Sequence, residues 1–338
     1  MKRPVNVTFY SFKGGVGRTL ALLDVAVMLA RAGRRVVAVD MDLEAPGFHH
    51  YPAIRPRVSD QPGVSDYMLD RLAGGELAIE PFTYRPDVSG VGDRLIIVPA
   101  GRRPRELAEL IPGLYTPPTE RALIFQVFVG RLAAAFAPDF ILFDSRTGLA
   151  EIAAICTVEL ADAIVALTGI NPQGVDGLVD VIGRIRRHPA RDEAPAFILA
   201  YSPVPHFAEC DIARMARTVS QPGLGVPVMT HPLVTRLAET HASLWTLAVA
   251  DDEQEVRRRF PALKRADRLH LLRYDPWVPV LGEADFDAPG PLREDHRRLA
   301  RSVGLLGGHD LMPELAGGAG GSPLTLVERF AGELRGDG

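Results

Sequence analysis

Residues 11–19 read SFKGGVGRT and place three glycines, Gly14, Gly15 and Gly17, within four positions near the start of the chain. Residues 5–10 before this stretch alternate in a β-rich pattern, and residues 20–32 after it are apolar nearly all round, without Pro or Gly. The order is therefore strand, loop and helix. Glycines let backbone N–H groups turn toward an anion, and the helix adds its positive N-terminal end. The stretch predicts a phosphate-binding loop.

The loop departs at two positions from the usual phosphate-binding pattern, G-x-x-x-x-G-K-[ST]. Phe12 stands where the first glycine is expected, and Arg18 stands where lysine is expected. Arginine keeps the positive charge and grips phosphate oxygens with two nitrogens, but its planar fork is bulkier than an ammonium. We therefore expect binding to survive, whereas the rate of hydrolysis is left open. The hydroxyl of Thr19 is the candidate Mg²⁺ ligand of the loop.

Lys13 directly precedes the glycines, so residues 13–19 match the order K-G-G-x-G-[KR]-[ST]. This order resembles the deviant Walker A loop of the MinD/ParA class of ATPases. In that class the early lysine, here Lys13, reaches the phosphates of the nucleotide held by the partner subunit. The resemblance implies ATP and Mg²⁺ as cofactors and an ATP-dependent homodimer. It assigns nucleotide binding to Lys13, Gly14, Gly15, Val16, Gly17, Arg18, Thr19 and Leu20.

Two acids follow the second predicted strand, residues 35–40, which the βαβ order makes parallel to the first. Asp40 and Asp42 lie at its carboxyl end, where open α/β sheets bind ligands. In the MinD/ParA pattern the second acid, Asp42, lies beside Mg²⁺ and orients the attacking water. Residues 39–47, VDMDLEAPG, resemble a subgroup of KGGVGR-motif variant ATPases and the ATPase domain of FxSxx-COOH-system proteins. Glu44 is either a solvated loop acid or helix cap, or, as the resemblance implies, a switch residue.

Residues 139–144, DFILFD, form another apolar strand that ends in an acid. An apolar strand that delivers an aspartate beside a phosphate-binding loop is the Walker B arrangement, so Asp144 is a candidate Mg²⁺ ligand. Residues 145–148 then form the second switch loop. Arg146 in this loop has two interpretations: an arginine finger that stabilises charge near the γ-phosphate, or a partner of carboxylates in a switch or another subunit. Residues 144–148, DSRTG, resemble the same subgroup.

The rest of the chain alternates strands and helices. Further buried strands are predicted at 95–99, 162–168, 196–201, 226–229 and 268–274, and helices at 64–72, 119–136, 174–187 and 291–306. We expect one doubly wound, mostly parallel α/β domain of the P-loop NTPase type over residues 1–312. A glycine-rich linker, 313–322, and a short amphipathic helix or tail, 323–338, are predicted to follow.

Base recognition is the least typical feature. In MinD/ParA proteins the loop after the strand at 196–201 reads adenine, usually through an Asn, and that Asn is absent here. Pro203 and Pro205 stand in this loop, and their backbone groups are the candidate replacement.

Charge and composition limit the other function classes. The net charge of −4 gives no global reason to expect nucleic-acid binding, and the densest positive cluster, residues 257–265, adjoins four acids at 251–255. A solvated helix face is therefore favoured there over a nucleic-acid patch. The charges of the tail cancel, which argues against membrane binding. The two cysteines, Cys156 and Cys210, have no metal spacing, and no apolar run is long enough to span a bilayer, so we expect a cytoplasmic protein.

Together these features predict a Mg–ATP-dependent dimerisation switch that hydrolyses ATP slowly, is stimulated by a partner, and recruits or releases that partner. Lys13, Arg18, Asp42 and Arg146 are the candidate catalytic residues, and Thr19, Asp42 and Asp144 the candidate metal ligands. The resembling proteins belong to multi-component bacterial systems, so the identity of the protein partner is left open. Two alternatives remain: an ATP-sensing scaffold with little hydrolysis because of Arg18, and a ParA-like DNA-associated ATPase.

Overall fold

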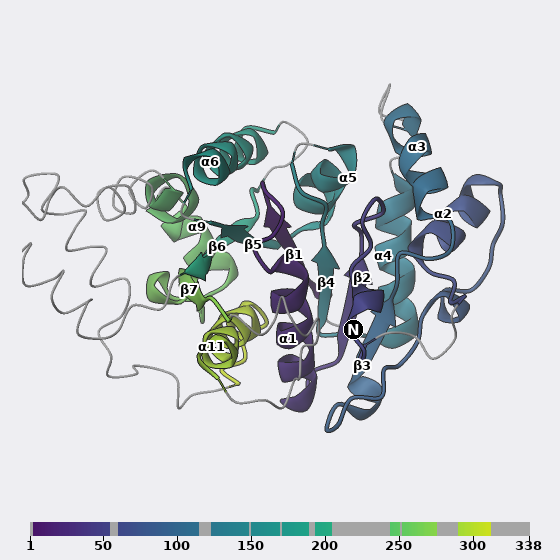
Figure 1. Ribbon diagram of the computed structural model, residues 1–338, viewed down its shortest axis with the longest axis horizontal. Helices are drawn as coiled ribbons and strands as arrows, with labels where there is room; N and C mark the ends of the chain where they lie inside the picture. Colours follow the sequence, from purple (N-terminus) through teal and green to yellow (C-terminus); the bar gives the residue numbers. More distant parts are fainter. Residues whose placement is uncertain are drawn as a thin grey trace, which may run out of the picture.

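The computed structural model describes residues 3–54, 60–114, 123–148, 150–169, 171–188, 193–204, 244–250, 252–275 and 290–311. A parallel sheet runs through the described part of the chain, with helices on both faces (Figure 1). The strand order is β3-β2-β4-β1-β5-β6-β7. The strands are β1 (Val5–Ser11), β2 (Val36–Asp40), β3 (Leu95–Val98), β4 (Phe140–Asp144), β5 (Ala163–Thr168), β6 (Ala196–Val204) and β7 (Leu269–Arg273). This architecture confirms the predicted doubly wound α/β fold.

The helices that cover the sheet differ widely in length. They are α1 (Arg18–Arg31), α2 (Val64–Leu72), α3 (Pro104–Leu114), α4 (Leu123–Phe136), α5 (Glu151–Ala154), α6 (Pro172–Arg186), α9 (Glu253–Arg259) and α11 (Pro291–Leu306). Two π-helical turns, η5 (Ile155–Leu160) and η7 (Thr246–Ala250), also pack on the sheet. Short 3₁₀ turns occur at Phe48–His50, Glu80–Phe82, Gly92–Arg94 and Arg265–Arg268. Among the described residues no helix is both long and apolar enough to cross a bilayer.

The central strands are buried almost throughout because helices cover both of their faces. In β1, Val7 and Phe9 pack in the same cluster as α1 and α11, whereas Tyr10 packs with α6 on the opposite face. In β4, Leu142 packs in the cluster of α1, whereas Phe143 packs with α2 and α4 on the opposite face. Alternate side chains of one strand therefore hold two helical layers against the sheet.

A buried polar cluster joins α1 to the C-terminal helix α11. Asp24 in α1 is 3% exposed and accepts a hydrogen bond from Arg293 at 2.7 Å; its second carboxylate oxygen contacts Nδ1 of His296. Since a buried carboxylate needs such partners, these contacts fix α11 against the helix that begins at the phosphate-binding loop.

The structure places most elements where the sequence predicts them. The helices at 64–72 and 291–306 have the predicted bounds. Helix α3 was not predicted because Pro112 and Gly113, which usually interrupt helices, stand in its last turn. Cys156 is fully buried, as expected of a packing residue. The predicted strand at 226–229, the linker 313–322 and the tail 323–338 lie outside the described residues.

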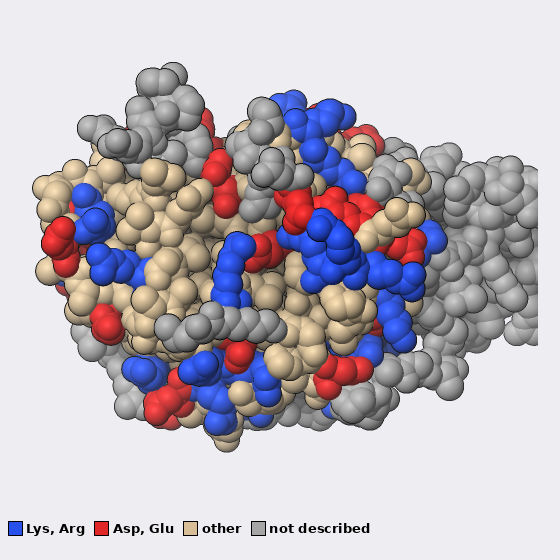
Figure 2. Space-filling view, turned by 180° about the vertical axis from the view of Figure 1, so that it is seen from behind, with Lys and Arg blue, Asp and Glu red and all other residues tan. Residues whose placement is uncertain are grey.

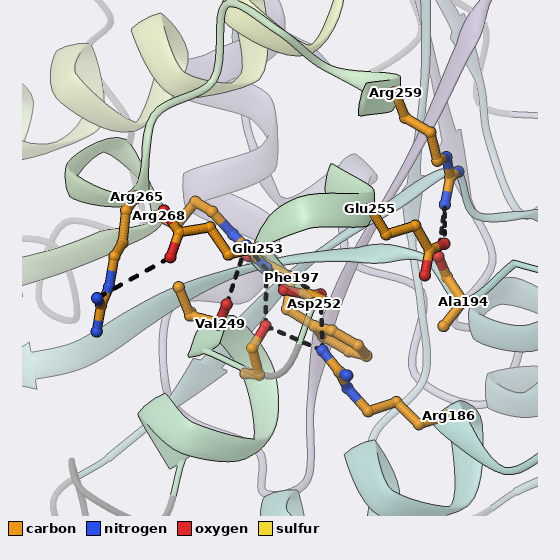
Figure 3. A network of polar contacts seen from close by, with 11 residues as sticks. Arg186, Ala194, Phe197, Val249, Asp252, Glu253, Glu255, Arg259, Arg265 and Arg268 are labelled. Atoms are coloured by element: carbon orange, nitrogen blue, oxygen red, sulfur yellow. Dashed lines mark hydrogen bonds and ion pairs between the residues drawn. The ribbon is translucent and has the colours of Figure 1, made fainter. Parts of the chain in front are cut away.

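A second buried ionic network holds the β6–β7 edge of the sheet (Figure 3). The side chain of Arg268 is 1% exposed and pairs with both carboxylate oxygens of Asp252, at 2.9 and 3.1 Å. It also donates to the carbonyl oxygens of Phe197 and Ala248, both at 2.8 Å. Arg186 from α6 reaches the same aspartate at 2.6 Å. One guanidinium thus connects β6, η7 and the start of α9.

Replacing Arg268 by methionine is expected to lower the free energy of unfolding by about 3–5 kcal/mol, because it leaves a buried carboxylate and two carbonyls short of donors. Urea unfolding checks this value. Arg184→Met is the matched control, since Arg184 forms an exposed pair with Asp180 on α6 and its loss is expected to cost at most about 1 kcal/mol. Equal losses for the two variants would contradict the assigned role.

Candidate functional site

The glycine loop connects β1, which ends at Ser11, to α1, which begins at Arg18. Gly15 and Gly17 have φ values of 78° and 74°, a conformation that glycine adopts without strain. A Cβ atom at Gly14 or Gly15 would meet nothing within 4 Å, so the backbone of the loop is open to an approaching group. The loop therefore has the free backbone surface that a phosphate cradle requires.

Arg18 points inward from the first position of α1 and bridges two acids. Its Nε lies 2.5 Å from Oδ1 of Asp144 at the end of β4, and its Nη2 lies 2.9 Å from Oδ2 of Asp42, just after β2. The side chain of Arg18 is 9% exposed, and those of Asp42 and Asp144 are 11% and 0% exposed. Thr19 donates its hydroxyl to the second oxygen of Asp144 at 2.6 Å. The structure thus gathers all three predicted metal ligands around Arg18.

Parallel pairing explains how residues so distant in the chain meet. β4 lies between β1 and β2, and Asp144 is in register with Phe9 on one side and Asp40 on the other. The carboxyl ends of the three strands therefore reach the same edge of the sheet, where α1 starts.

Asp40 has a different environment from Asp42. It accepts hydrogen bonds from the backbone N–H groups of Asp42, Gly47 and Phe48 at 3.0 to 3.2 Å, which ties the loop after β2 to the strand end. Burial and the neighbouring Asp144 raise the pKa of Asp40 to about 8, although the three N–H groups oppose that shift. Asp40 thus positions the loop after β2 through these three backbone hydrogen bonds, a role that sequence reasoning did not assign to it.

Burial and ion pairing act in opposite directions on the bridged groups. Burial alone would lower the pKa of Arg18, but the carboxylates of Asp144 and Asp42 outweigh it and raise the pKa. Burial raises the pKa of Asp144, while Arg18 and Thr19 oppose the rise. The guanidinium therefore stays charged inside the site.

Arg146 pairs with Glu44, so the loop after β4 contacts the loop after β2. Both side chains are partly exposed, 32% for Arg146 and 48% for Glu44. This contact corresponds to the second interpretation of Arg146, a partner of a switch carboxylate, and it gives Glu44 a cross-loop contact that solvation alone would not predict.

Lys13 is exposed at the tip of the loop, with its Nζ 5.9 Å from the centre of the Phe12 ring. The Phe12 ring lies against α6 at Gly177, where a Cβ atom would come within 2.1 Å of the ring. A glycine inside a helical pattern is the signal that sequence analysis could have used to find this contact.

Two more hydrogen bonds hold the loops around the site. Ser202 in β6 donates to the carbonyl oxygen of Val16 at 2.7 Å, and Tyr10 donates to the carbonyl oxygen of Gly148 at 2.8 Å. Pro203 is exposed beside Ser202, which places the candidate base-reading segment next to the glycine loop, and Pro205 lies outside the described residues. Sequence reasoning missed Ser202, whose only signal was its position directly before Pro203.

The residues present fit a Mg²⁺–nucleotide. Mg²⁺ takes oxygen ligands and is commonly held by one or two carboxylates together with substrate phosphates, and Thr19, Asp42 and Asp144 offer a hydroxyl and two carboxylates beside an open glycine loop.

Fold and site together define a P-loop nucleotide-binding protein built on a parallel α/β sheet. Residues 7–244 match the family model of the CobQ/CobB/MinD/ParA nucleotide-binding domain, and the chain belongs to this family. No protein of curated function matched the sequence.

Solved structures with the same fold are distant in sequence. A McdA variant from Cyanothece in complex with ATP superimposes with a TM-score of 0.61 at 12% identity, covering 90% of this chain and 98% of that one. A putative plasmid partition protein from Borrelia burgdorferi bound to AMPPNP superimposes with a TM-score of 0.54 at 16% identity, covering 89% of this chain and 98% of that one. MinD from Pyrococcus horikoshii with Mg-ADP superimposes with a TM-score of 0.51 at 16% identity, covering 89% of this chain and 96% of that one. At these identities the likeness establishes the fold.

Gly177→Ala is expected to weaken nucleotide binding while raising the intrinsic stability of α6 by up to about 1 kcal/mol, because alanine favours helix but its methyl group displaces Phe12 and the glycine loop. Fluorescent-nucleotide titration and thermal unfolding measure the two effects. Gly183→Ala in the same helix is the control, since its Cβ would meet only the guanidinium of Arg187, at 3.2 Å. Unchanged nucleotide affinity in Gly177→Ala would show that Phe12 does not position the loop.

Proposed function

We propose that the protein is a Mg–ATP-dependent dimerisation switch that hydrolyses ATP to ADP and phosphate and so recruits or releases a protein partner. The observation that carries this proposal is the meeting of the glycine loop, Arg18, Asp42 and Asp144 at one edge of the sheet. Membership of a nucleotide-binding family and the ATP, AMPPNP and Mg-ADP held by proteins of the same fold support it.

Each residue of the site has a part in this chemistry. The N–H groups of residues 14–19 would bind the phosphates, and Thr19, Asp42 and Asp144 would hold Mg²⁺, which neutralises phosphate charge when bound. Asp42 lies at the rim of the buried site, 8% exposed, where its carboxylate could orient a water molecule toward the terminal phosphorus. The oxygen of the water would bond to that phosphorus as the bond to the ADP oxygen breaks, and the proton that the water loses would pass to the phosphate products or to solvent.

Dimerisation is proposed from the position of Lys13. Its side chain is exposed on the open face of the loop and belongs to no ion pair that the structure records among the described residues. A cation in this place can neutralise the phosphates of a nucleotide in a facing subunit, so that nucleotide binding and subunit contact favour one another. The resemblance of residues 13–19 and 39–47 to the KGGVGR-motif subgroup supports the same interpretation.

A second candidate function, an ATP-sensing scaffold with little hydrolysis, is favoured by the buried pairs of Arg18. If the guanidinium stays with the two acids when nucleotide binds, transition-state charge lacks one of its usual partners.

The structure gives less support to a DNA-associated ATPase. Within the positive cluster, Arg258 and Arg259 contact Glu193, and Arg265 contacts Glu253. Figure 2 shows one face of the molecule, on which Lys and Arg side chains lie beside Asp and Glu. Such a mixed surface attracts phosphate backbones weakly.

The single domain over 1–312, its linker and its tail remain predictions.

Lys13→Ala is expected to abolish ATP-dependent dimerisation and to lower ATP hydrolysis by about 10²-fold, because it removes a cation from developing phosphate charge. Asp42→Ala is expected to stop hydrolysis and leave the ATP-bound dimer in place. Light scattering and phosphate release, each with Mg–ATP, measure the two properties.

The matched control is Lys264→Ala, which removes an exposed lysine remote from the glycine loop. It is expected to behave as the unmodified protein does. Tight ATP binding without turnover or change of mass would exclude the switch and support the scaffold. Absence of ATP binding would exclude both functions.

A further inference from the structure

The ligand atoms that would hold Mg²⁺ are already engaged by the protein itself. Oδ1 of Asp144 accepts from Arg18 and its Oδ2 accepts from Thr19. Oδ2 of Asp42 accepts from Arg18 and its Oδ1 accepts from the N–H of Ala45 at 3.3 Å. All four carboxylate oxygens therefore have a donor, and one guanidinium supplies two of the four hydrogen bonds.

One guanidinium offsets part of the negative charge at this site without a metal ion. Among the described residues Asp40 accepts hydrogen bonds from backbone N–H groups, whereas the carboxylates of Asp42 and Asp144 face the guanidinium of Arg18. A free divalent cation would have to displace the guanidinium and leave it buried without an anion, which is unfavourable. A nucleotide removes this obstacle, because its phosphates offer the guanidinium a new anionic partner at the start of the same helix.

We propose that Arg18 is an internal cation that closes the Mg²⁺ ligand set until the phosphates of a nucleotide draw its guanidinium away, so that the divalent metal binds only together with nucleotide. This inference deepens the proposed function and rests on its nucleotide site. It also gives a reason for arginine at this position: a planar fork reaches two carboxylates at once, whereas a lysine ammonium is a point charge.

The test measures binding of Mn²⁺ alone to nucleotide-free protein by electron paramagnetic resonance. A neighbouring opposite charge changes the proton affinity of a carboxylate by ~10- to 10³-fold, so Arg18→Met is expected to bind Mn²⁺ at least about tenfold more tightly than the unmodified protein. The same variant is expected to bind ATP in EDTA more weakly, because the phosphates lose a cationic partner. The Mn²⁺ affinity of Arg18→Lys is expected to lie between that of Arg18→Met and that of the unmodified protein.

Arg273→Met is the matched control. Arg273 makes a two-pronged pair with Asp295, which is 6% exposed and remote from the glycine loop, and its removal is expected to change neither Mn²⁺ nor ATP binding. Equal Mn²⁺ affinity in Arg18→Met, Arg18→Lys and the unmodified protein would overturn the proposal.

The unmodified protein provides a measurement that does not depend on the folding of a variant. Micromolar binding of Mn²⁺ without nucleotide would by itself overturn the proposal, and binding only near or above about 1 mM supports it. If no form of the protein binds ATP with Mg²⁺, the proposed function fails, and the release of Arg18 by nucleotide fails with it. The comparison of Mn²⁺ affinities still decides whether Arg18 closes the ligand set.

Discussion

The buried contact of Arg18 with Asp144 and Asp42 is the interaction on which the rest of the site depends. These acids stand 126 and 24 residues away from Arg18 in the chain, and only the parallel pairing of β1, β2 and β4 brings them within reach. Two acidic groups at the end of a covered sheet would repel one another without a cation between them. The guanidinium therefore offsets part of the negative charge that the fold concentrates there.

The loops around this charge are held by hydrogen bonds to backbone atoms. Asp40 fixes the loop after β2 through backbone N–H groups, Ser202 holds the carbonyl of Val16, and Tyr10 holds that of Gly148. These contacts come from three different strands, so the edge of the sheet sets the positions of the loops. Glu44 and Arg146 form a more exposed link between two of the same loops, and such partly solvated pairs contribute little to stability and separate easily.

Sequence patterns predicted the fold because continuous apolar strands, a glycine loop and alternating helices all specify the same parallel sheet. They also selected Thr19, Asp42 and Asp144 as candidate metal ligands, and the structure brings these three side chains together around Arg18. They did not predict that Arg18 turns toward the acids, because the direction of a side chain depends on the register of strands that are distant in sequence. Asp40 and Ser202 were missed for a related reason: their partners are backbone atoms, which leave no signature in residue type.

Arginine in place of the usual lysine links stability, metal access and turnover to one side chain. In the proposed function, the pairs of Arg18 with Asp42 and Asp144 would be lost when nucleotide binds, and part of the favourable interaction between phosphate and Arg18 would offset that loss. This cost would lower nucleotide affinity, and the nucleotide-free and nucleotide-bound states would differ in the anions that Arg18 contacts. For a switch this difference matters more than affinity, because a ligand shifts a conformational equilibrium only by its preference for one state. A slow ATPase and a sharply responding switch are therefore compatible outcomes of the same substitution.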